Sequence, residues 1–322
     1  MSTSITFKKI NKLAIPALIA GIAEPVLSIT DTAIVGNIEV NATESLAAVG
    51  IVGAFISMLI WVFGQTRSAI SSIVSQHLGA NKLDAVKNLP AQAIFVITSI
   101  SILIILGTFP FASAIFKLYN ASDLILDYSV TYYKIRVFGF PFTLFTMAVF
   151  GVFRGLQNTT YPMIIALIGA LLNIVLDIIL VYGIEGYISP LNIEGAAYAS
   201  IIAQIVMAIL SAILLIRKTE IPLKITFPFN KEIKRFLIMI ANLFIRTISL
   251  NVALRVTSMQ ASLWISSSIV ICKSPAGSGG ALGVAVSSRS GASLRSNILS
   301  FSLPVVTALW PPNRPIVSTQ SI

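Results

Sequence analysis

Cysteine and histidine are almost missing from this sequence, which contains one of each, Cys272 and His77. A single cysteine excludes a disulfide within the chain and any metal site built from several cysteines. A single histidine leaves little from which a zinc site or a catalytic triad could be assembled, and no HExxH, P-loop or paired-cysteine spacing is present. We therefore expect no metal, no cofactor and no enzymatic activity.

Charged residues are also scarce, at 11% of the chain, whereas soluble domains carry about 25%. Hydrophobic residues make up 56%, and the mean hydropathy is +0.91. This composition predicts an all-α polytopic membrane protein whose main surroundings are the lipid bilayer. The net charge of +10 could indicate a nucleic-acid partner, but the basic residues lie between apolar segments on alternate sides, so we expect none.

Apolar segments of about 20 residues predict membrane-spanning helices. Six of them follow one another, at about residues 13–36, 45–77, 89–111, 124–153, 161–183 and 195–216. Basic residues fall in every second connection, and the other connections hold several acids and one lysine, Lys117. Because positively charged loops stay on the cytoplasmic side, the pattern predicts a multi-pass protein with a cytoplasmic N-terminus.

The second part of the chain is expected to differ from the first. We divide it into a six-helix lobe over residues 1–216, a cytoplasmic linker over 217–230 and a seventh membrane helix over 231–254. The remaining stretch, 255–322, is rich in serine, has no Asp or Glu and contains no run of 18 strongly apolar residues. This composition predicts a disordered tail, similar to what a shifted reading frame would encode.

Two acids stand out because they lie inside apolar segments. Asp177 is four residues after Asn173, so the two share one face of a helix, and Asp31 lies deep in the first segment. A carboxylate in the membrane costs about 2.5–3.5 kcal/mol on insertion scales and usually marks a functional site. We expect the two acids to meet inside the bundle as a proton or cation site. The alternative is that Asp177 only joins helices by hydrogen bonds.

Other polar residues in the predicted spans are candidates for the wall of a cavity. Glu24 precedes Asp31 by two helical turns, with Ser28 between them on the same face. Tyr132, Tyr133 and Arg136 lie near the start of the fourth span. Tyrosines at that position also occur as an interfacial belt, so both interpretations stay open.

Seven stretches together resemble the multidrug and toxic compound extrusion (MATE) family, and within it the branch of DNA-damage-inducible protein F. They are SITDTAIVG, SQHLGANKLDAVKN, YYKIRVFGFPF, FRGLQNTTYPM, LLNIVLDIILVYG, IEGAAYASIIAQ and KEIKRFLIMIANLFIRTISL. They occur in the family's order over residues 7–254. The resemblance covers the N-terminal lobe and ends at about Leu254.

The resemblance implies twelve helices in two lobes, placed in the inner membrane of a bacterium. It implies H⁺- or Na⁺-coupled antiport that exports small organic, often cationic, compounds. Matched residue by residue, the cation-coupling positions are Asp31, Asn173 and Asp177, and Ser200 falls near a hydroxyl position of the sixth helix. A family member would have five further spans where this sequence has its serine-rich stretch.

Three other functions remain open. The chain could be a truncated remnant that does not transport, or a membrane interaction protein. A flippase for lipid-linked sugars is less favoured, because such proteins need a more basic cavity and only Arg67 and Arg136 lie plausibly inside the first six spans. An intramembrane enzyme is the weakest option, since no nucleophile with a neighbouring base is evident.

Overall fold

A computed structural model describes residues 7–39, 41–219, 221–222, 230–247, 249, 269–271 and 284–286. Within these ranges the side chains of Lys9, Glu24, Pro25, Ser28 and both strands are not described. The chain divides into two compact units, residues 1–248 and 249–322, which are described separately.

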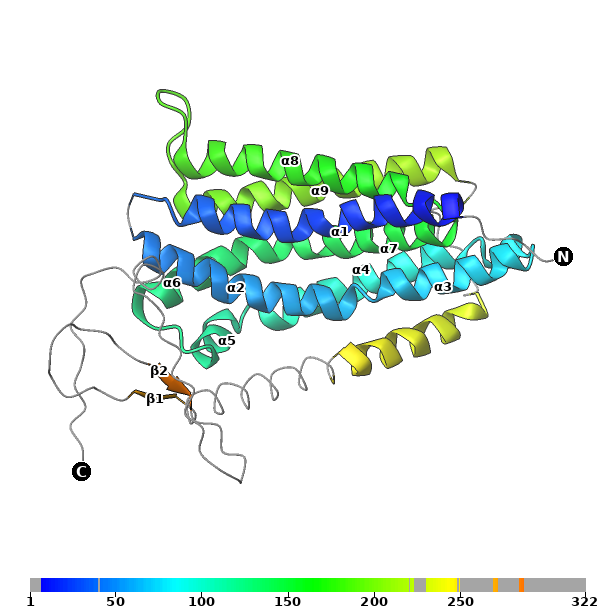
Figure 1. Ribbon diagram of the computed structural model, residues 1–322, viewed down its shortest axis with the longest axis horizontal. Coiled ribbons are helices and arrows are strands. Elements are labelled where there is room, and N and C mark those ends of the chain that lie inside the picture. Colours follow the sequence, from blue (N-terminus) through cyan, green and yellow to red (C-terminus); the bar gives the residue numbers. More distant parts are fainter. Residues whose placement is uncertain are drawn as a thin grey trace, which may run out of the picture. The chain divides into compact units, whose positions relative to one another are not determined.

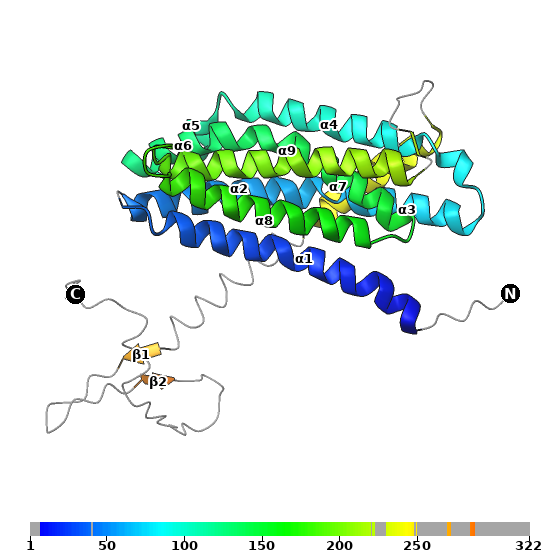
Figure 2. The same cartoon turned by 90° about the horizontal axis from the view of Figure 1, so that it is seen from above.

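The first unit is a bundle of helices (Figures 1 and 2). Its elements are α1 (Phe7–Val35), α2 (Ala42–Phe63), α3 (Thr66–Gly79), η1 (Leu83–Val86), α4 (Leu89–Thr108), α5 (Ala112–Leu118), α6 (Asp123–Arg136), η2 (Val137–Gly139), α7 (Phe140–Gly155), α8 (Thr160–Tyr182) and α9 (Asn192–Lys218). The short helix α5 was not expected from the sequence.

Five segments of the described chain are long and apolar enough to cross a membrane: Ala42–Gly79, Leu83–Thr108, Asp123–Gly155, Thr160–Tyr182 and Asn192–Lys218. They correspond to the second to sixth predicted spans. The first predicted span is part of α1, a helix of 29 residues whose described apolar part is the shorter stretch Ile10–Ala23. The bundle therefore confirms an all-α polytopic lobe.

The faces of α8 show why the lobe suits a membrane. Its buried face carries small and polar residues, among them Gly169, Asn173 and Asp177. Its exposed face carries large apolar side chains, such as Leu171 and Ile178, which are 66% and 50% exposed. In water this distribution would be costly, whereas in lipid, helices pack through small residues and turn apolar ones outward.

The connections rich in basic residues and those rich in acids lie at opposite ends of the bundle. The connections between α1 and α2 and between α8 and α9 lie at one end, and the start of α1 and the end of α3 lie at the other (Figure 1). We call the latter the basic end, because it carries basic residues that include Lys8, Lys12, Lys82, Lys87, Arg217 and Lys218. The opposite end is called the acidic end.

The span Asp123–Gly155 is interrupted near its middle. Between α6 and α7 the chain forms the 3₁₀ turn η2, and Pro141 follows at the start of α7. Proline lacks the amide hydrogen needed for a regular helical bond, so the break is encoded at this point. Arg136, the last residue of α6, sits directly at the break.

A further helical segment, residues 232–247, packs against this bundle at the basic end. The Asn230 side chain donates to Ala85 O at 2.8 Å, and the Asn230 amide donates to Gln92 Oε1 at 2.8 Å. Arg235 Nη2 donates to Gln76 Oε1 at 2.7 Å, and Phe236 is fully buried. The segment is the start of the predicted seventh helix, whose later residues 248 and 250–254 lie outside the described part.

In the second unit the structure describes two short strands, β1 (Ile269–Ile271) and β2 (Val284–Val286). They pair antiparallel, with Val270 opposite Ala285. The rest of the predicted disordered tail, 255–322, lies outside the described residues, so that interpretation stays a prediction.

Candidate functional site

The two intramembrane acids meet at the contact between α1 and α8, which pack against each other (Figure 2). The carboxyl groups of Asp31 and Asp177 lie within hydrogen-bonding reach of one another. Asp177 is fully buried, and Asp31 is partly exposed. Both lie within the last two turns of their helices, which places the pair in the half of the lobe nearer the acidic end.

No other donor from the described residues reaches Asp31 Oδ1 or either carboxyl oxygen of Asp177. Ionised carboxylates are acceptors only, so two of them in contact cannot satisfy each other. Buried acceptors left without a partner are costly. A proton shared between the acids, or a cation bound by both, removes that cost.

Asn173 and Ser200 form the next polar contact, one turn along α8 from Asp177. Asn173 Nδ2 donates to Ser200 Oγ on α9 at 3.4 Å, and both side chains are about 4% exposed. α8 and α9 come this close because Gly195 of α9 has no side chain. An added Cβ there would lie 2.5 Å from Leu180 O. The amide oxygen of Asn173 remains available as a ligand near the acids.

Arg136 supplies the positive charge of this region. It acts electrostatically on Asp31, Asp177 and Tyr132. The side-chain amide of Gln204 is assigned the orientation that satisfies both of its ends, in which Arg136 Nη1 donates to Gln204 Oε1 at 2.8 Å and Gln204 Nε2 donates to Gly139 O at 3.1 Å. We call Asp31, Asp177, Asn173, Ser200, Arg136 and Gln204 the acid cluster.

Gln204 is the member of the acid cluster that sequence analysis missed. A signal was present, because Gln204 is a polar residue in an apolar span and follows Ser200 by one helical turn. Gly139 permits its position, since an added Cβ at that residue would overlap the side-chain amide of Gln204.

The remaining candidates have other places. Tyr133 donates from its hydroxyl group to Thr108 Oγ1 at 2.6 Å, and its ring packs against Phe55 and Phe116. The structure therefore brings Tyr132, but not Tyr133, together with the acids. Glu24 and Ser28 lie on α1, and their side chains are outside the described part of the chain.

The oxygen atoms of the acid cluster are ligands of the kind that hard cations bind. Carboxylate, amide and hydroxyl oxygens are the ligand types that such ions prefer. In the part of the chain that the structure describes, no group of three or more His, Cys, Asp or Glu could hold a metal ion.

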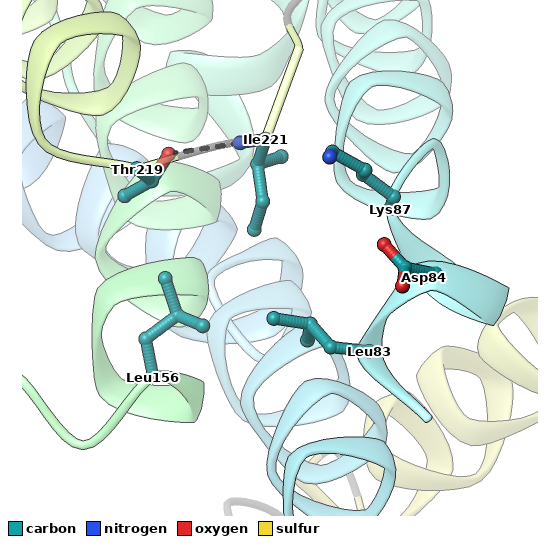
Figure 3. A pocket seen from close by; sticks show the side chains of 6 residues that line it. All are labelled: Leu83, Asp84, Lys87, Leu156, Thr219 and Ile221. Carbon is teal, nitrogen blue, oxygen red and sulfur yellow. Dashed lines mark hydrogen bonds between the residues drawn. The ribbon is translucent and has the colours of Figure 1, made fainter. Parts of the chain in front are cut away.

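A separate pocket lies at the basic end, with a volume of about 220 Å³. Its walls come from the η1 region and from the ends of α7 and α9: Leu83, Asp84, Lys87, Leu156, Thr219 and Ile221. Figure 3 shows the Ile221 amide donating to Thr219 Oγ1, at 3.3 Å. This pocket contains no residue of the acid cluster.

Several curated proteins are similar to this chain. DNA damage-inducible protein F of Escherichia coli is 27% identical over 211 residues, which is 66% of this chain and 44% of the relative. Multidrug resistance protein MdtK of Edwardsiella ictaluri is 32% identical over 172 residues, 53% of this chain and 37% of the relative. The chain thus spans less than half the length of these relatives.

Solved structures match the fold. One described as MATE in the bent conformation has a TM-score of 0.69 at 23% identity, covering 77% of this chain and 54% of that one. Another, the outward-facing conformation of a multidrug resistance MATE family transporter of the MOP superfamily, has a TM-score of 0.67 at 22% identity, covering 77% and 54%. The MatE family model matches residues 16–179, just over half of the chain, so this protein belongs to the MatE family.

Proposed function

We propose that this chain forms the N-terminal lobe of a cation-coupled antiporter that exports organic compounds, and that Asp31 and Asp177 are its coupling acids. The observation that carries the proposal is the contact between two carboxyl groups from α1 and α8 inside a membrane lobe, with no other described donor at three of their oxygens. Intramembrane acids in this setting commonly mark ion pathways.

The coupling follows from the energetics of the pair. With both acids ionised, the repelling carboxylates favour a state in which water or a bound cation reaches them. With a proton or Na⁺ bound, the pair can be enclosed at lower cost. Alternating access requires a ligand that binds two conformations with different affinity. Asn173 supports this exchange by offering its amide oxygen next to Asp177.

The charge of the acid cluster favours a cationic cargo. Two carboxylates face one guanidinium, so the described cluster is negative when both acids are ionised. The relatives whose names speak of multidrug resistance are consistent with export of diverse small compounds. A flippase for lipid-linked sugars, which would have to hold phosphate groups, fits this negative cluster poorly.

The test uses a two-lobed protein in which this lobe is joined to the second lobe of a relative. Asp177→Asn is expected to abolish dye efflux driven by a proton or Na⁺ gradient while expression stays intact. Glu185→Gln, which changes an exposed acid in the connection after α8, is the matched control and should leave efflux unchanged. Normal coupled efflux by Asp177→Asn contradicts the proposal.

The 322-residue chain alone is expected to give a pump-deficient bacterium no dye resistance, because one lobe cannot alternate between two closed states.

We further propose that the protein lies in the cytoplasmic membrane of a bacterium with its basic end inside. The basis is the alternation of basic and acidic connections. Single cysteines placed at Asn41 and Lys82 in a Cys272→Ser background should react with a membrane-impermeant maleimide from opposite sides. Labelling of both positions from the same side contradicts the six-span arrangement.

A further inference from the structure

The acid cluster continues as a polar ladder between α8 and α9. Asp177 and Asn173 are one turn apart on α8, and Ser200 and Gln204 are one turn apart on α9. The hydrogen bond from Asn173 to Ser200 joins the two helices in the middle of the ladder. The ladder thus runs from the acid pair toward the basic end, and its last step is the contact between Gln204 and Arg136.

At its contact with Gln204, Arg136 has neutral partners. Gln204 accepts from Arg136 Nη1 at 2.8 Å and is itself fixed by donating to Gly139 O at 3.1 Å. The hydroxyl group of Tyr132 also lies near the guanidinium group. Arg136 acts electrostatically on the acids, but its guanidinium group lies farther from their carboxyl oxygens than the 4.0 Å of an ion pair. Among the described residues, an ion pair is formed by Glu232 and Arg235, at 3.4 Å.

The position of Arg136 gives it room to move. It is the last residue of α6, next to the 3₁₀ turn η2, and turns of this kind inside a helical rod often mark hinges. Its side chain is long and only partly buried. The nearby cation Lys134 is exposed and lies 5.7 Å from the centre of the Phe109 ring. It therefore does not face the acids as Arg136 does.

We propose that Arg136 is an internal counter-cation of Asp31 and Asp177, that Gln204 positions it away from them, and that it competes with the coupling cation for the carboxylates. This rests on the proposed function, because it assumes that the acid pair binds a cation. Binding of a proton or Na⁺ leaves Arg136 on Gln204, and release of the cation lets the guanidinium approach the ionised acids.

The net charge of the acid cluster also limits how many cations it can bind at one time. With both acids ionised and Arg136 nearby, the described cluster is one positive charge short of neutrality. A single proton, a single Na⁺ or a single monovalent organic cation completes it, and a second would leave an uncompensated positive charge in the membrane.

The experiment measures how readily the acids are protonated in the purified 322-residue chain in lipid nanodiscs. Dicyclohexylcarbodiimide reacts with protonated carboxyl groups in apolar surroundings, and peptide mass mapping gives the labelling rate at Asp177 and Asp31. At an alkaline pH where the parent's acids are mostly ionised, Arg136→Gln should speed labelling by about tenfold or more, since a nearby opposite charge changes proton affinity by about one to three powers of ten. Arg136→Lys should stay near the parent rate because it keeps the charge.

Gln204→Leu should act in the opposite direction. Without its neutral partner Arg136 is free to pair with the carboxylates, so labelling should slow by about tenfold or more, the effect of roughly one lost hydrogen bond to a charged group. Lys134→Gln, which removes an exposed charge on the same helix, is the control and should change nothing. General damage to the fold would move Arg136→Gln and Gln204→Leu in the same direction, so opposite shifts are the diagnostic result.

The outcomes separate this inference from the function on which it rests. Unchanged rates in Arg136→Gln and Gln204→Leu, or shifts of the same sign, overturn the counter-cation role. If the parent's labelling still falls with added Na⁺ or with rising pH, the coupling site itself stands. Labelling of neither acid under any condition overturns both proposals.

Discussion

Tyr132 and Tyr133 are neighbours on α6 and belong to one buried cluster, yet they face two different regions of it, which we call its two interiors. Tyr132 turns toward Arg136 and the acid cluster. Tyr133 enters what we call the aromatic core, formed by Phe55, Phe116 and Tyr133, where ring centroids lie 5.3 to 6.0 Å apart. Adjacent residues on a helix point about 100° apart, so one helix can serve both regions.

The two interiors differ in how well their polar groups are satisfied. In the aromatic core the one described hydroxyl group, that of Tyr133, donates to Thr108 at 2.6 Å. In the acid cluster both oxygens of Asp177 lack a donor other than Asp31. A satisfied apolar core stabilises a fold, whereas an unsatisfied polar cluster lowers stability and provides binding. The comparison supports a structural role for the aromatic core and agrees with the proposed exchange of ions at the acid cluster.

The largest effect on stability is expected from the aromatic core. Phe116 is fully buried and packs edge-on against Phe55 and Tyr133. Phe116→Ala leaves a cavity and should lower the free energy of unfolding by about 3–5 kcal/mol. Thermal unfolding in detergent measures this. Carbodiimide labelling of Asp177 below the unfolding temperature should stay at the parent rate, and a changed rate would show that the two interiors are not separable.

Asp177→Asn should have a smaller effect of the opposite sign. An asparagine amide can donate to the Asp31 carboxylate, which satisfies acceptors that now lack a donor. We expect the free energy of unfolding at neutral pH to rise by about 1–2 kcal/mol, the cost of leaving a buried polar group unsatisfied. The same substitution should abolish coupled efflux. A loss of stability as large as that of Phe116→Ala would indicate that Asp177 is part of the structural core.

Much of this arrangement follows from local sequence patterns. The apolar runs predicted five of the spans, and the four-residue spacing of Asn173 and Asp177 predicted their common face. The expected meeting of Asp31 with Asp177 is also seen. These features depend on helix geometry and on the cost of placing a carboxylate in an apolar environment, and both can be read from one segment at a time.

The features that were missed depend on packing between segments. The partnership of Gln204 with Arg136 requires α9 to lie against the break after α6, which no single segment reveals. The separation of Tyr132 from Tyr133 depends on which neighbours α6 has on each side. The helix α5 was missed because its seven residues, Ala112–Leu118, are too few to show a helical period.

The smallest effects are expected from Tyr132 and Tyr133, whose substitution tests most directly where the boundary between the two interiors lies. Tyr133→Phe removes the hydroxyl donor to Thr108 and should cost about 1 kcal/mol of unfolding free energy with no change in acid labelling. Tyr132→Phe removes a polar neighbour of Arg136, which frees the guanidinium to approach the acids, so it should slow labelling by about twofold, as loss of a weak polar contact would. Each variant is the control for the other, because the two change the same atom on neighbouring residues. Slower labelling in Tyr133→Phe, or an unchanged rate in Tyr132→Phe, would show that the boundary between the two interiors does not run between these residues.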